Sequence, residues 1–350
     1  MLTSLPPEVL LKIFHDACLD DGTTGRSLSS VSRSIRRISA EYRYQSLAVD
    51  VLRGRTTRLL LSTLTATPEH LRRIRYLYIN RAQHFTNSTF DPWFGIDVPA
   101  VRYKKEKETG RDLREILRLA APHVETLTLL FQVGAKESLE KGDLHLEDLH
   151  MPRLRELTVD CPAYLLKRVT ADFAPVLKRL CIPSRLLTRE FGEAFPTRFP
   201  HLTRLLILPL RYLTTEQWRT LRVLMFTMGL HSGQYVHGPD VTRLAVMSST
   251  SRRYIIVQPY LSTRDLRRTA NDRHATLTDC LKNCAMRSHR FVVLSTKFED
   301  ETAAAAASHA GEWKVNWLES VQGGVGVWDY RNVPRKPCAP YHSSHWCCAD

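Results

Sequence analysis

The sequence has no hydrophobic run long enough to cross a membrane. A transmembrane helix needs about 18 or more apolar residues in succession, whereas the longest candidates, 205–210 and 223–226, are far shorter. The amino-terminal end also lacks the basic segment of a secretory signal, and Glu8, Lys12 and Asp16 interrupt its apolar residues. We therefore expect a soluble protein with no membrane partner, located in the cytoplasm, the nucleus or both.

Cysteine is scarce, with 8 among 350 residues at irregular spacing. This excludes the disulfide framework of a small secreted protein, and we expect reduced thiols. Two groups contain residue types that bind zinc: Cys280, Cys284 and His289, and the tail residues Cys338, His342, His345, Cys347 and Cys348. Neither group has the spacing of a zinc finger, so we expect no metal and no other cofactor.

Recognisable catalytic motifs are also missing. The sequence contains no Gly-x-Ser-x-Gly, no His-Glu-x-x-His and no Walker loop. We therefore expect a binding protein and not an enzyme.

Positive charge is abundant, but it is not concentrated. The net charge of +14 comes from 50 Lys and Arg against 36 Asp and Glu, which raises the question of nucleic acid as a partner. The basic residues are dispersed in small groups without the interleaved aromatic residues of a single-strand binding platform. A solvated basic surface is the favoured interpretation, and a basic solenoid that binds nucleic acid or another polyanion is the alternative function.

Apolar residues recur at helical spacing in the first 50 residues. Pro6 and Pro7 suit the first turn of a helix, with Ser4 as its N-cap. The apolar positions of the two predicted helices are Val9, Leu10, Ile13 and Phe14, then Leu28, Val31, Ile35 and Ile38. A unit of about 50 residues buries too little surface to be stable alone. We therefore expect an interaction module, whereas periodicity alone equally allows a helical hairpin packed on its own chain.

These residues resemble an F-box, the motif that docks onto the Skp-type adaptor of cullin ubiquitin ligases. The similar segments are 5–14, 28–35 and 42–49, and the polar, glycine-containing connector 20–26 departs from the pattern. The resemblance implies an SCF complex in which the chain reaches a cullin through the adaptor. The adaptor-binding residues that it implies are Leu5, Pro6, Glu8, Val9, Leu10, Ile13, Phe14, Leu28, Val31 and Ile35.

A short apolar pattern then recurs along the chain. Its units begin at Ile74, Val124, Leu154, Leu177, Leu202 and Val241. The central units follow one another at about the 20–29-residue period of leucine-rich repeats. Such units stack through parallel strands, whose outward residues form a concave surface. The candidate ligand contacts on that surface are Thr126, Thr128, Glu156, Thr158, Arg179 and Arg204.

Between these units, residues 83–107 are predicted to form a long insertion loop, followed by a helix over 111–120. Further on, the pattern predicts strands at 254–257 and 291–294 with a helix over 277–286 between them. Residues 311–332, with Trp313 and Trp317 one helical turn apart and a Gly-Gly-x-Gly sequence, resemble the closing segment of fungal F-box proteins. We expect their indoles to cap the last repeat.

The predicted fold class is α/β, with an N-terminal helical F-box followed by an irregular leucine-rich-repeat-like solenoid of parallel strands and outer helices. The predicted domains are an F-box at 1–50, a recognition domain at 51–310, a capping segment at 311–332 and a flexible tail at 333–350. The resemblance implies a substrate-recognition subunit of a cullin-type ubiquitin ligase, in which the repeats bind an unknown protein target.

Overall fold

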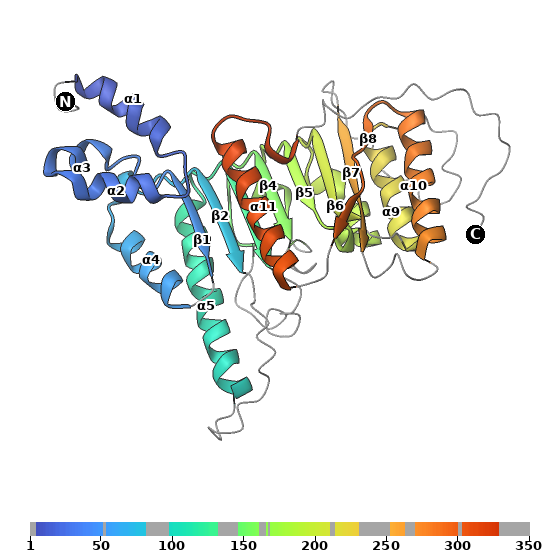
Figure 1. Ribbon diagram of the computed structural model, residues 1–350, viewed down its shortest axis with the longest axis horizontal. Helices are drawn as coiled ribbons and strands as arrows, with labels where there is room; N and C mark the ends of the chain where they lie inside the picture. The colour runs from blue at the N-terminus through green and yellow to red at the C-terminus, as the bar shows by residue number, and fades with distance from the viewer. Residues whose placement is uncertain are drawn as a thin grey trace.

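A computed structural model describes most of the chain. The described residues are 5–51, 54–81, 98–131, 146–160, 166, 169–210, 214–230, 253–262, 270–299 and 303–328. Three helices come first: α1 (Pro7–Ala17), α2 (Thr23–Val31) and α3 (Arg33–Ser39). They lie together at one end of the molecule, beside the first strand of a long sheet (Figure 1).

The sheet is parallel throughout, and neighbouring strands follow one another in chain order. Its path runs from β1 to β8, and β9 pairs with β7 beyond the end of β8. The strands are β1 (Ser46–Asp50), β2 (Tyr76–Arg81), β3 (Thr126–Phe131), β4 (Glu156–Asp160), β5 (Arg179–Ile182), β6 (Arg204–Leu210), β7 (Tyr254–Ser262), β8 (Phe291–Val293) and β9 (Lys297–Glu299). Strictly sequential parallel pairing is the arrangement of a solenoid. The α/β class with parallel strands is therefore confirmed.

The recurring apolar residues of the sequence form continuous rows across this sheet. One row consists of Leu77, Leu127, Leu157, Leu180, Leu205 and Ile255, which are register partners from β2 to β7. All six are fully buried. The unit predicted at 241–246 lies outside the described residues, and the strand that pairs with β6 is the one predicted at 254–257. The strand predicted at 291–294 is β8.

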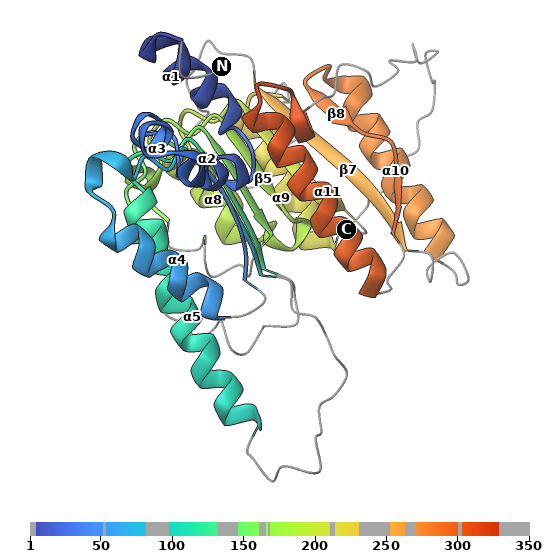
Figure 2. The ribbon, with the colours of Figure 1, turned by 60° about the vertical axis from the view of Figure 1, so that its left-hand side comes forward.

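One face of the sheet is covered by helices (Figures 1 and 2). They are α4 (Gly54–Ala66), α5 (Val98–Ala120), α8 (Arg189–Arg198), α9 (Thr215–Thr227) and α10 (Ala270–Arg287). Short 3-10 helices also occur: η2 (Glu69–Leu71), η4 (Ala171–Phe173), η5 (Ser184–Leu186) and η8 (Gly326–Trp328). Apolar residues of the five longer helices join the inward rows of the strands in one large core.

The prediction of a loop over 83–107 is wrong for its last part. Helix α5 already begins at Val98, so residues 98–107 are helical, whereas 82–97 lie outside the described residues. Pro99 sits in the first turn, where its missing N–H breaks no helical hydrogen bond. The apolar residues of the helix predicted over 111–120, such as Leu113 and Ile116, are buried in the core, as the spacing requires.

The opposite face of the sheet is covered by the C-terminal helix α11 (Ala303–Val321), which Figure 2 shows lying across it. Trp313, Trp317 and Val321 follow one another at i, i+4 and i+8 and are buried in a second core with residues of the strands. The ring centroid of Trp317 lies 5.5 Å from that of Tyr78 on β2. We expected these indoles to cover the last repeat, but they cover early strands because the helix folds back along the sheet.

This arrangement also corrects the predicted ligand contacts on that face. Thr126, Thr128, Glu156 and Thr158 are buried, and only Arg179 and Arg204 are half-exposed. The pleat does direct these side chains away from the helical layer, as predicted. They nevertheless do not form an open surface at β3 and β4.

Strand β1 lies within the segment predicted as an F-box. Residues 46–50 pair in parallel with residues 76–80 of β2, and Val49 belongs to the core of the sheet. The helical part of this segment therefore ends before residue 46. We refer to residues 5–45 below as the helical module.

Candidate protein-interaction surface

The helical module has a small core of its own. Leu10, Phe14 and Ile35 are buried together, and Leu28, Ile38 and Tyr42 pack against them half-buried. The structure thus places four of the predicted adaptor-binding residues in the interior of the module. They are Leu10, Phe14, Leu28 and Ile35. In this conformation they stabilise the module and offer little surface to a partner.

Another face of α1 remains uncovered. Leu5, Val9 and Ile13 are 37%, 41% and 39% exposed, whereas Leu10 and Phe14 are each 2% exposed. Successive helical positions differ by about 100°, so Val9 and Ile13 occupy a sector of α1 adjacent to that of Leu10 and Phe14, and the module covers only the second sector. Leu5 lies just before the helix, which begins at Pro7. We call Leu5, Val9 and Ile13 the exposed stripe.

Exposed apolar residues concentrate in this module. Besides the exposed stripe it contains Val31, which is 66% exposed at the end of α2. The other large apolar residues exposed in the described part of the chain are dispersed: Leu59 on α4, Val176 in the turn before β5, Met286 on α10 and Val315 on α11. Pro6 and Glu8, the remaining predicted contact residues, are exposed as well. Isolated exposed apolar residues are ordinary on protein surfaces, whereas an ordered group suggests an interaction site.

The segment predicted as one helix over 28–38 is divided in two. Ser32 has extended dihedrals, φ −158° and ψ 165°, which end α2 and begin α3. Its hydroxyl oxygen accepts a hydrogen bond from the Ile35 backbone N–H at 3.1 Å. Serine competes well for the N-cap position, and this local preference prevails over the continuous apolar spacing.

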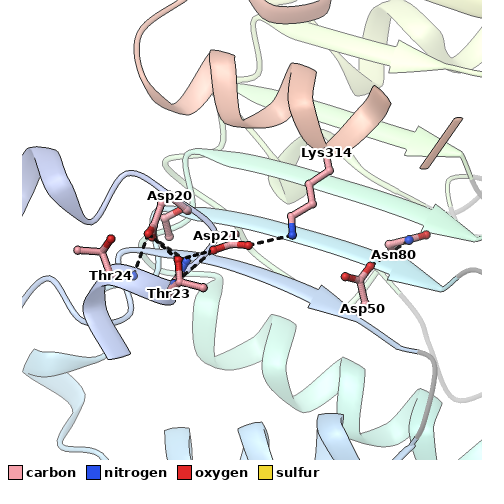
Figure 3. Close-up of polar contacts among 9 residues, drawn as sticks. Asp20, Asp21, Thr23, Thr24, Asp50, Asn80 and Lys314 are labelled. Atoms are coloured by element: carbon pink, nitrogen blue, oxygen red, sulfur yellow. Dashed lines mark hydrogen bonds and ion pairs between the residues drawn. The ribbon is translucent and has the colours of Figure 1, made fainter. Parts of the chain in front are cut away.

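The connector between α1 and α2 is an ordered turn (Figure 3). The Asp20 carboxylate accepts hydrogen bonds from the backbone N–H groups of Gly22 and Thr24, each at 2.8 Å, and from the Thr23 hydroxyl. Partial burial acts to raise the pKa of Asp20, but these hydrogen bonds outweigh it and hold the pKa below its usual value. The carboxylate thereby caps the first turn of α2.

Two glycines of this connector are required by the geometry. Gly22 has φ +94°, a left-handed conformation that other residues rarely adopt. A Cβ atom on Gly25 would lie 2.5 Å from the backbone oxygen of Arg43, so only glycine allows the two segments to approach. The polar composition that departs from the F-box pattern therefore has a structural reason in this chain.

A polar cluster joins the end of α1 to the sheet. The Arg75 guanidinium donates to both carboxylate oxygens of Glu125, at 2.9 and 3.1 Å, and its Nη1 lies 3.2 Å from Nε2 of His15. Because arginine only donates, His15 Nε2 is the acceptor. The Gln45 side-chain amide also donates to the backbone oxygen of His15 at 3.3 Å. This joint limits how far α1 can move relative to β2 and β3.

The module also carries exposed positive charge. Arg26 of α2 and Arg33, Arg36 and Arg37 of α3 are exposed. The guanidinium Nε of Arg36 donates to the backbone oxygen of Ser29. A partner that covers these arginines would gain from acidic side chains of its own.

Sequence reasoning missed two parts of this region. Arg75 and Glu125 occupy equivalent positions directly before β2 and β3. Opposite charges at equivalent positions of neighbouring repeats could have predicted their ion pair. The contact of Asp21 with Lys314 of α11, at 2.9 Å, had no such signal, because 293 residues separate the two.

The cysteines of the described regions do not form a site. Cys284 lies in the core on α10, and Cys280 is half-buried on the same helix. The Cys and His residues of the tail lie outside the described residues. Within the described regions, no group of three or more His, Cys, Asp or Glu side chains is placed to hold a metal ion. None of the helices described has the length and apolarity needed to cross a membrane.

Comparison with protein-family models and with curated protein sequences identifies no relative. No protein-family model matches the chain, and no curated protein sequence matches it. The class that the structure defines is an α/β protein with one sequentially ordered, all-parallel sheet and a helical module at its start.

Proposed function

We propose that this chain is a substrate-recognition subunit of a cullin-type ubiquitin ligase and docks onto a Skp-type adaptor through the helical module. The observation that carries the proposal is the exposed stripe on α1, within a segment whose sequence resembles an F-box. A helix that presents exposed apolar residues one turn apart, as α1 does with Val9 and Ile13, is a common way to fill a groove of a partner protein.

The adaptor-binding set is narrower in this proposal than the sequence implied. Leu5, Val9 and Ile13 of the exposed stripe, with Val31, make the direct contacts, while Leu10, Phe14 and Ile35 hold α1 in place beneath them. Full burial of an aliphatic side chain contributes about 1.5–3 kcal/mol. Since the stripe residues are already more than half-buried, each adds less than this on binding.

The remainder of the chain serves binding and placement in this proposal. A subunit that holds a protein target near the transfer machinery accelerates the reaction by raising the local concentration of the target and needs no nucleophile of its own. The long sheet with its helical layer offers a rigid surface for the target, and no residue of the chain is assigned a catalytic role.

The experiment is a binding measurement with a purified Skp-type adaptor. Ile13→Asp should lower the affinity at least about tenfold, because it places a charge in an apolar interface. It should leave the circular dichroism and the melting temperature nearly unchanged, since the side chain is exposed. Leu59→Asp is the matched control, because Leu59 is exposed on α4, outside the module.

Phe14→Asp is a poor test, because a charge at this buried position would unfold the module itself. Equal adaptor affinity for the wild type and Ile13→Asp would reject the proposed interface, and no adaptor binding by the wild type would reject the function.

Nucleic-acid binding is less well supported. Several arginines of the sheet form ion pairs, among them Arg75 with Glu125, Arg179 with Glu156 and Arg185 with Asp160. Paired arginines contribute little to a continuous positive surface. Retention on nucleic acid that falls steeply with salt would favour this alternative over the ligase subunit.

A further inference from the structure

The C-terminal helix reaches back to the beginning of the chain. Lys314 Nζ of α11 lies 2.9 Å from Oδ2 of Asp21, in the connector between α1 and α2 (Figure 3). Directly after the end of the helix, the Gln322 side-chain amide donates to the backbone oxygen of Leu19 at 3.4 Å. Two residues of the C-terminal segment therefore contact the same connector of the helical module.

Electrostatics at this contact agree with the geometry. The hydrogen bond from Lys314 is the largest influence on the pKa of Asp21 and lowers it, against a smaller opposing effect of partial burial. Both side chains are about one-third exposed, so solvent screens the pair only in part. The other carboxylate oxygen of Asp21 accepts from the Thr23 hydroxyl at 2.8 Å. Asp21 thus connects α2 and α11 with its two oxygens.

The same C-terminal segment is anchored firmly to the sheet. Glu156 of β4 is 3% exposed, and its carboxylate accepts from the indole N–H of Trp328 at 2.7 Å and from the Ser320 hydroxyl at 3.3 Å. Arg179 of β5 lies 2.8 Å from it. A buried carboxylate is tolerated only with such partners. Together with the packing of Trp317 on Tyr78, they attach the segment to β2, β4 and β5.

We propose that α11 is a brace, which fixes the orientation of the helical module relative to the sheet through its contact with the connector 19–24. The module has other attachments to the sheet. They are the chain itself at β1, the contact of His15 with Arg75, the ion pair of Glu41 with Arg73, and the hydrogen bonds that the Ser46 hydroxyl and the Ala48 backbone N–H of β1 donate to the backbone oxygens of Asp20 and Asp21. The brace adds a side-chain contact between Asp21 of the connector and Lys314, 293 residues away in sequence, and so links the connector to a helix that is itself anchored on β2, β4 and β5.

The brace does not depend on what the module binds. If the module docks onto an adaptor, the brace fixes the position of the sheet relative to the ligase. It thereby also fixes the position of a target bound to the sheet. The alternative use of α11, as a plug that leaves the sheet when a target arrives, requires the Trp317 and Glu156 contacts to break, and the experiment below distinguishes the two.

The test is a double-mutant cycle read by amide hydrogen exchange of the full chain. Lys314→Glu places two carboxylates together, and Asp21→Asn leaves an oxygen for Thr23 but turns an N–H₂ group toward residue 314. Each single change should accelerate exchange in residues 19–31 on the order of threefold to tenfold. The double variant, with both Asp21→Asn and Lys314→Glu, should regain much of the protection of residues 19–31 against exchange. The side-chain amide of the new asparagine can donate to the carboxylate of the new glutamate.

Lys282→Glu is the control for the charge change, since Lys282 lies 3.8 Å from Asp279 in a more exposed ion pair on α10, far from the module in sequence. Exchange in β5–β7 and the affinity for the adaptor should remain within about twofold of wild type in all variants. This separates the brace from general destabilisation and from the docking surface itself.

Unchanged exchange at 19–31 in both single variants would overturn the brace, as would equal acceleration in β5–β7. Loss of protection at 303–328 on addition of a target protein would show that α11 acts as a plug. If Lys314→Glu fails to fold, Asp21→Asn alone decides the question, because it is the milder change.

Discussion

Replacing Trp317 with alanine tests directly whether α11 is part of the folded core. The side chain is 3% exposed and contacts the ring of Tyr78 on β2. An aromatic side chain of this size buries about 200 Å², which at about 25 cal/mol per Å² corresponds to about 5 kcal/mol. Because alanine retains part of this burial and the cavity relaxes, we expect a loss of about 3–5 kcal/mol in the free energy of unfolding.

The assay is urea denaturation followed by far-UV circular dichroism, which does not depend on the fluorescence of the tryptophan that is removed. Val315→Ala is the matched control, because Val315 lies two positions away on the same helix and is 63% exposed. Its effect should stay within about 0.5 kcal/mol. A change in the slope of the transition for Trp317→Ala would indicate that α11 detaches before the sheet unfolds.

A loss smaller than about 1 kcal/mol for Trp317→Ala would refute the reasoning, since it lies below the range observed for tryptophan removed from a packed core. Equal effects of the two substitutions would refute it as well. Either result would mean that the helix does not pack on the sheet through this face.

Three further outcomes follow from local geometry. Gly25→Ala should destabilise the protein by more than about 1 kcal/mol, because its Cβ would meet a backbone oxygen at 2.5 Å, whereas Gly311→Ala, with no neighbour within 4 Å, should be neutral or stabilising in thermal melts. Asp20→Ala should cost about 1 kcal/mol at pH 7. Because the folded pKa of Asp20 is depressed, the carboxylate stabilises the fold above its unfolded pKa of about 3.9, and the difference from the variant should shrink as the pH falls through the folded value. Burial raises the pKa of Cys18 to about 11 and that of Cys181 well above its usual value, so iodoacetamide at pH 7.5 should label both thiols, as detected by mass spectrometry, only after denaturation.

The repeated strands were predictable because their signal is local. Leu77, Leu127, Leu157, Leu180 and Leu205 stand at equivalent positions of successive units, and they are register partners in the sheet. A side chain that alternates between two faces produces this pattern in any sheet with a buried face. The parallel order then follows, since each unit can bury its strand only against the next unit.

The candidate site was predictable only in part. The spacing in α1 identified Val9, Leu10, Ile13 and Phe14 as one apolar group, but it could not decide which of them the module itself would cover. That decision depends on where α3 lies relative to α1. The break at Ser32 sets the direction of α3, and it follows from one N-cap hydrogen bond and not from the apolar spacing.

The sequence by itself determined where apolar faces exist: the inward rows of the strands, the apolar face of α1, and the indole face around Trp313 and Trp317. These follow from periodicity, which is a property of neighbouring residues. Only the tertiary structure decided which surface covers each face. It placed the indole of Trp317 against Tyr78 of β2, and it brought Lys314 to Asp21. Such a contact depends on the twist and rise accumulated over the whole sheet, which no short segment encodes.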